Sequence, residues 1–133
     1  MKLKFGLLIL LACSIYSCSK VEGTGGGATI IGILFEQKYN TLGNPISNGF
    51  YAKADNDVFL IYRSENTFYD DDTKSSYDGS FEFRYLQKGK YKVFVYEDCT
   101  TCPSGKQALI YEVEITKRNE VVNLDTITIK KQL

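Results

Sequence analysis

The residues whose spacing most suggests chemistry are two cysteines three positions apart, Cys99 and Cys102, followed by a proline. A Cys-x-x-Cys pair can act as a redox dithiol, because this setting can lower a thiol pKa and speed exchange. Such pairs usually precede a helix in a βαβ unit, and no helix is predicted here. A zinc site would need two more ligands. The favoured interpretation is a structural disulfide, with thiol exchange or a metal shared with a partner as alternatives.

Histidine is absent from all 133 residues, which removes the commonest general base and neutral metal ligand. Catalysis by Ser-His-Asp or Cys-His is therefore excluded from this chain alone. Many Asp and Glu residues exist, but none lies in a recognisable catalytic context. The 16 basic and 16 acidic side chains balance, and this balance argues against nucleic-acid binding by electrostatic attraction. The prediction is a protein that is not an enzyme, with no cofactor and no resident metal.

Acidic residues cluster at 70–72, with Asp55 and Asp57 upstream. Carboxylates are calcium ligands, but the chain has no Asp-x-Asp-x-Asp-Gly loop ending in Glu. The favoured interpretation is a solvated turn or a charged guard on an edge strand. The alternative is a calcium-binding module that uses the loops at 43–57 and 69–72.

Aromatic residues are abundant, with 10 Tyr and 8 Phe but no Trp. Exposed rings on a sheet can stack on sugars, so the same loops could serve a glycan-binding module. Strands are enriched in Tyr and Phe for packing reasons alone. Core or cross-strand packing is therefore the favoured interpretation of most of these rings.

The first 17 residues have the pattern of a secretory signal peptide. Lys2 and Lys4 precede an uncharged apolar run at 5–12, which is too short to remain as a membrane-spanning helix. The segment that follows, Ile15-Tyr16-Ser17-Cys18, resembles the lipobox of bacterial lipoproteins. In that family the cysteine receives a diacylglyceryl group, the signal is cut before it, and the new amino terminus is usually acylated.

Cys13 also follows a lipobox-like segment, but two arguments favour Cys18 as the lipidated residue. Cleavage before Cys13 would leave a very short apolar region. It would also leave an odd number of thiols in an oxidising compartment. Loss of Lys2 and Lys4 leaves 14 basic against 16 acidic side chains, so the acyl chains must supply the membrane attachment. The predicted location is a Gram-negative cell envelope, with the outer membrane favoured.

Residues 18–27 are predicted to be an acylated cysteine and a flexible glycine-rich tether. Residues 28–131 then alternate short apolar or period-two segments with turn residues, and no segment shows a helical period. An Asp-Gly pair at 78–79 indicates a hairpin turn, and a change of phase near Asp125 indicates a β-bulge. The pattern predicts an all-β domain, a seven-stranded Greek-key β-sandwich, with strands near 28–35, 58–63, 73–76, 81–85, 91–96, 109–115 and 121–129.

Several segments of this domain resemble the carboxypeptidase regulatory-like, or prealbumin-like, family. They are Asp78-Gly79-Ser80-Phe81-Glu82-Phe83, Leu86, Gly89-Lys90-Tyr91-Lys92-Val93, Gly43-Asn44-Pro45-Ile46 and Val121-Val122-Asn123-Leu124. The resemblance implies a prealbumin-like sandwich over about 28–129. It does not transfer a function, because unrelated roles share this fold. A transthyretin-like hydrolase of the same broad fold would need histidines that this chain lacks.

The sequence thus predicts a non-enzymatic, membrane-anchored lipoprotein that serves as an interaction or accessory module, with a protein or glycan as its partner. The alternatives are the glycan- or calcium-binding module and a thiol-exchange factor centred on Cys99 and Cys102.

Overall fold

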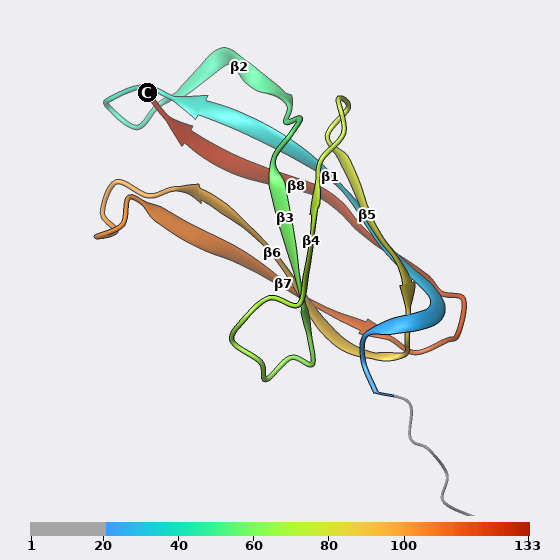
Figure 1. Cartoon of the computed structure of the whole chain (residues 1–133). Helices are drawn as coiled ribbons and strands as arrows, with labels where there is room; N and C mark the ends of the chain where they lie inside the picture. Colours follow the sequence, from blue (N-terminus) through green and yellow to red (C-terminus); the bar gives the residue numbers. More distant parts are fainter. Residues whose placement is uncertain (1–20) are drawn as a thin grey trace, which may run out of the picture.

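The computed structural model describes residues 21–133, which form a two-layer β-sandwich (Figure 1). No helix occurs within this range, and so none of its segments is a helix that could cross a membrane. The eight strands are β1 (Thr24–Tyr39), β2 (Pro45–Ala52), β3 (Asp57–Tyr62), β4 (Asp71–Lys74), β5 (Ser80–Leu86), β6 (Gly89–Asp98), β7 (Lys106–Ile115) and β8 (Val121–Gln132).

The first sheet, sheet A, is built around the long strand β1. β8 runs parallel to it, whereas β5 and β2 are antiparallel to its first and second halves. The change of partner falls at Leu34, whose N–H donates to Gly79 and whose carbonyl accepts from Lys53. One strand thereby organises the whole sheet.

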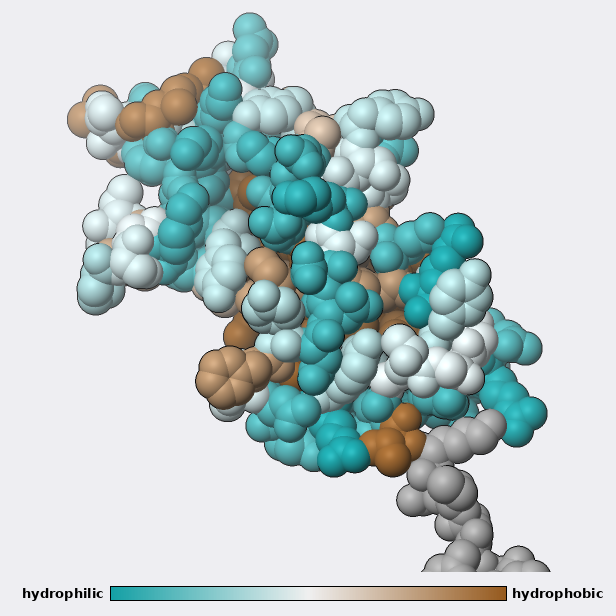
Figure 2. Space-filling view, viewed as in Figure 1, coloured by the Kyte–Doolittle hydropathy of each residue, from teal (hydrophilic) through white to brown (hydrophobic). Residues whose placement is uncertain are grey.

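The second sheet, sheet B, has the order β4-β3-β6-β7, with every neighbouring pair antiparallel. The core lies between the sheets, and alternation along each strand supplies it. On β5, for example, Phe81 and Phe83 are buried while Glu82 and Arg84 face solvent. The view in Figure 2 shows a mostly hydrophilic outer surface with separate hydrophobic patches.

The all-β sandwich predicted from the sequence is confirmed, but three local expectations are wrong. The structure has eight strands instead of seven, because residues 37–39 complete β1 and 45–52 form β2, between two predicted strands where no strand was expected. The expected tether at 18–27 overlaps β1, which begins at Thr24. The strand predicted at 73–76 is β4, and it covers Asp71–Lys74.

The glycine-rich segment enters the sheet because its glycines permit close contact. A Cβ at Gly26 would lie only 2.0 Å from the carbonyl oxygen of Leu86. Glycine content alone suggested flexibility, whereas here the lack of side chains is a packing requirement.

Two local features were predicted correctly from residue types. The bulge in β8 lies where the β1–β8 register shifts, and Asp125 there has a φ of 56°. Gly79 forms the predicted turn with a φ of 83°. The predicted hairpin is wrong, however, because the strands on either side of that turn do not pair: β4 belongs to sheet B and β5 to sheet A. Turn residues fix the local backbone, but they do not choose the strand partner.

Candidate binding surface

An apolar row crosses the outer face of sheet B. Phe59 pairs with Asp72 of β4 on one side and with Phe94 of β6 on the other, and Phe94 pairs with Ile110 of β7. Residues paired across neighbouring strands project from the same face. The flanking residues Val58 and Leu60 are fully buried, so Phe59 and its row point away from the core.

The rings of this row form a continuous aromatic cluster. Phe59 and Phe94 stack with centroids 4.8 Å apart and planes inclined by 17°. Tyr96 meets both rings edge-on, and Tyr69 lies 4.8 Å from Phe59. The outer members remain open to solvent, with Tyr69 54%, Tyr96 48% and Ile110 56% exposed. These five residues, Phe59, Tyr69, Phe94, Tyr96 and Ile110, are called the aromatic face below.

Polar side chains border the aromatic face on both sides along the strands. Lys74 contacts Asp57 at 2.8 Å beyond one edge. Lys92 pairs with Glu112 beyond the other. Apolar ring surface next to hydrogen-bonding groups can contact the C–H face of a sugar and bind its hydroxyl groups at the same time.

The predicted acidic cluster is divided by the fold. Asp55 and Asp57 lie 3.9 and 2.8 Å from the ammonium group of Lys74, and Asp70 accepts a hydrogen bond from the backbone of Tyr62. Asp72 stands on the edge strand β4, the guard position that the sequence favoured. Within residues 21–133 no group of three or more acidic or cysteine side chains has the spacing of a metal site.

The two loops expected to share a glycan or calcium site are also separated. Most of 43–57 is β2 in sheet A, whereas 69–72 leads into β4 in sheet B. Of these loops, Tyr69 belongs to the aromatic face, and Asp57 and Asp72 stand beside it. Sequence reasoning missed the face itself, because residues 58–62 of β3 and 93–96 of β6 are consecutive apolar residues, and only Lys90 and Lys92 mark the outer side of β6.

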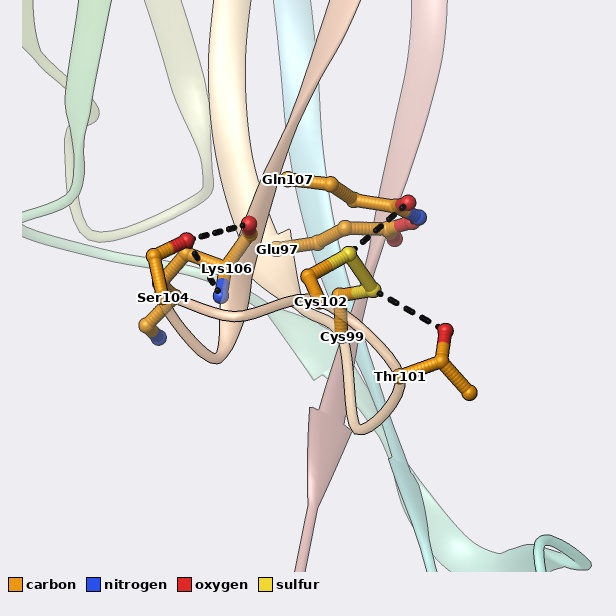
Figure 3. Close-up of a disulfide and its surroundings, with 7 residues drawn as sticks. All are labelled: Glu97, Cys99, Thr101, Cys102, Ser104, Lys106 and Gln107. Carbon is orange, nitrogen blue, oxygen red and sulfur yellow. Dashed lines mark hydrogen bonds between the residues drawn. A yellow bond between two sulfur atoms is a disulfide. The ribbon is translucent and has the colours of Figure 1, made fainter.

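Cys99 and Cys102 form a disulfide in the loop between β6 and β7, with Cα atoms 5.4 Å apart (Figure 3). The polar contacts of the sulfurs are with neutral side chains: Thr101 Oγ1 lies 3.6 Å from Cys99 Sγ and Gln107 Oε1 lies 3.9 Å from Cys102 Sγ. The loop is closed further by a hydrogen bond from the Cys99 N–H to Gly105. This arrangement fits the structural disulfide better than an activated dithiol.

At the same end of the sandwich, buried carboxylates are held by polar partners. Burial disfavours the charged form of Glu36, but hydrogen bonds from Tyr51 and Lys53 outweigh it and hold the pKa of Glu36 below its usual value. The hydrogen bond to Glu36 raises the pKa of Tyr51 to about 12. Glu97 accepts hydrogen bonds from Gln107 and from the backbone of Lys130. These satisfied contacts are structural.

The predicted lipidation residue Cys18, its competitor Cys13 and the signal peptide lie outside the described residues. The described chain starts three residues after Cys18, and its first segment is fixed to the domain. Gly23 N–H donates to the hydroxyl group of the buried Tyr91 at 2.9 Å.

Comparison with known proteins adds a distant likeness only. No family model and no curated protein matches the chain. A solved structure from Pseudomonas aeruginosa, described as a "putative carbohydrate binding protein", superposes with a TM-score of 0.46 at 10% identity. The match covers 82% of the present chain and 91% of that one. A likeness this distant assigns no ligand to the present chain.

Proposed function

We propose that this protein is a non-enzymatic, lipid-anchored module of the Gram-negative cell envelope whose aromatic face binds a glycan. The observation that carries the proposal is the stacked Phe59–Phe94 pair, extended by half-exposed Tyr96 and Tyr69 on one side of sheet B. Packing between neighbouring strands is enough to explain the stacked Phe pair by itself. The exposed Tyr rings at the margin extend the apolar surface to solvent, where a ligand can contact it.

A glycan fits these residues better than an apolar protein partner. The aromatic face is narrow, because Lys92 and Glu112 on one side and the Lys74–Asp57 ion pair on the other limit it. A sugar ring presents a similarly small apolar patch surrounded by hydroxyl groups. Phenol and carboxylate groups at the border can donate and accept the hydrogen bonds that such a ligand needs.

The anchoring part of the proposal rests on the sequence at Cys18. The lipobox-like segment ends there, and only two residues separate it from the described residues, which start at Val21. Acylation of this cysteine would hold the sandwich close to a bilayer, with the outer membrane as the favoured site. The prealbumin-like relationship suggested by the turn and strand motifs belongs to the same proposal.

A thermal-shift screen against soluble envelope oligosaccharides tests the glycan part. A ligand that binds only the native state raises the midpoint, by a ligand-concentration-dependent amount. We expect a rise with at least one oligosaccharide class, and its loss in the Tyr96→Ala and Tyr69→Ala variants. A screen in which no oligosaccharide shifts the midpoint, or in which the shift survives both substitutions, would contradict the proposal.

Mass spectrometry of the amino-terminal peptide from native membranes tests the anchor. We expect a peptide that starts at Cys18 and carries the mass of a diacylglyceryl group. A mature terminus at another residue, or an unmodified Cys18, would show that the anchor assignment is wrong.

A further inference from the structure

The end of the sandwich where β1 begins carries basic side chains on two neighbouring turns. Lys88 lies in the β5–β6 turn and Lys90 just after it, while Lys117 and Arg118 lie in the β7–β8 turn. The chain as a whole is balanced in charge, so this local concentration, called the basic end below, is not visible from the composition. In Figure 1 the two turns lie beside the start of β1.

Two acidic residues of this region, Glu22 and Glu120, contact other groups, and a third, Glu114, is the cross-strand neighbour of Lys90. Glu22 lies 3.5 Å from Arg63 and also accepts from the backbone of Lys90. Glu120 accepts from the backbone N–H groups of Thr116 and Lys117 within its own turn. Lys88 and Arg118 make no ion pair with any residue of 21–133 and are exposed. Their charges are therefore available to an anion.

A hollow of about 240 Å³ lies between these two side chains. Gly25, Gly26 and Gly27 also line it, and Gln87 and Asn119 add amide groups to the lining. Thr24 and Ala28, on either side of the glycines, both pair with Leu86 of β5. The three glycines between them therefore form a bulge in the β1–β5 ladder. A phosphate group would meet two cations, amide donors and bare backbone in this hollow.

The position of Cys18 identifies which phosphate can reach the hollow. Three residues of chain span at most about 11 Å, and they connect Cys18 to Val21 at this same end of the domain. We propose that the basic end is a membrane-docking surface on which Lys88 and Arg118 bind the phosphate groups of lipid headgroups. The inference rests on the anchoring part of the proposed function. It implies that the domain sits on the bilayer with its disulfide loop directed away.

The test uses the mature chain with Cys18→Ser, which keeps every described residue and needs no acylation. Binding is measured to vesicles of phosphatidylcholine alone and of phosphatidylcholine mixed with phosphatidylglycerol. We expect binding only to the mixed vesicles, weakening as salt is added. The double variant Lys88→Gln/Arg118→Gln should lose about thirtyfold in affinity, since each basic side chain near an anionic surface contributes about fivefold. The matched control Lys92→Gln/Lys130→Gln removes the same charge elsewhere and should lose less than about fivefold.

Equal losses in the two double variants would overturn the proposal, as would binding that does not depend on phosphatidylglycerol. Binding of inorganic phosphate without vesicle binding would overturn it too, because the ligand would then be a soluble anion. A second arm labels lysines of the acylated protein in both kinds of vesicle. Lys88 should be severalfold less reactive in the mixed vesicles and Lys130 unchanged. If only the predicted acylation of Cys18 is wrong, the mass of the amino-terminal peptide shows it independently of vesicle binding.

Discussion

The outer faces of the two sheets carry phenylalanine pairs of the same geometry and differ in what surrounds them. On sheet A, Phe35 and Phe50 stack at 4.8 Å and 19°, and on sheet B, Phe59 and Phe94 stack at 4.8 Å and 17°. Among the described residues of sheet A no further aromatic ring extends this pair, and the residue beside Phe35 on the neighbouring strand β8 is Thr128. The sheet B pair continues into Tyr69 and Tyr96. The stacked pair is therefore a packing device common to both sheets, and the Tyr extension distinguishes sheet B.

The largest expected loss of stability comes from a substitution at Gly79, in the turn that connects the two sheets. Gly79 connects β4 of sheet B to β5 of sheet A, and a Cβ there would lie 2.2 Å from the carbonyl oxygen of Leu34. Gly79→Ala should lower the free energy of unfolding by more than about 3 kcal/mol, because a strained positive φ adds to a backbone clash. Urea unfolding measures the loss.

Gly43→Ala is the matched control for that substitution. Gly43 has a similar φ of 80°, but no atom lies within 4 Å of the position its Cβ would take. Only the backbone strain remains, and the expected loss is about 1 kcal/mol. Equal losses in the two variants would show that the close approach of Gly79 to Leu34 contributes nothing.

Removal of the disulfide tests how firmly the β6–β7 hairpin holds Tyr96 in the aromatic face. In the Cys99→Ser/Cys102→Ser variant the free energy of unfolding should fall by about 2 kcal/mol, the contribution expected from a disulfide that closes so short a ring. Oligosaccharide binding by the folded fraction should persist. A reduction potential of the native pair above about −200 mV, typical of exchange catalysts, would instead support the thiol-exchange hypothesis.

A smaller effect concerns Tyr51, which pairs with Glu36 on the sheet A side. The pKa of Tyr51 is raised to about 12 from an ordinary value of 10.0, so its contribution to stability is complete below pH 10 and is lost as pH rises towards 12. The stability difference between the native chain and Tyr51→Phe should shrink over that interval. A difference that stays constant from pH 9 to 12 would contradict the assigned hydrogen bond.

The sequence predicted the features that depend on local residue types. The period of two on β5 and the bulge at Asp125 follow from the alternation of apolar and polar residues, and the turn at Gly79 follows from backbone freedom. All three are present. Which strands pair with one another was harder to predict from the sequence. The residues around Gly79 specify a turn, but only the packing of both sheets shows that the turn joins separate layers.

The candidate surface was not predictable for a related reason. Phe59 and Phe94 lie within runs of consecutive apolar residues, 58–62 and 93–96, so their outward direction depends on which neighbours fill the core. The prediction of a flexible tether at residues 25–27 was wrong for a different reason. Its composition is that of a linker, and only its close approach to Leu86 shows that it belongs to β1.

The most direct test of the account compares oligosaccharide affinity in two variants that remove similarly exposed rings. Tyr96 is 48% exposed on sheet B and Phe50 is 52% exposed on sheet A. By isothermal titration calorimetry, Tyr96→Ala should weaken binding about tenfold, or about 1.4 kcal/mol. Phe50→Ala should leave the affinity within about twofold. Equal losses in the two variants, or a loss confined to Phe50→Ala, would contradict the assignment of the ligand to sheet B.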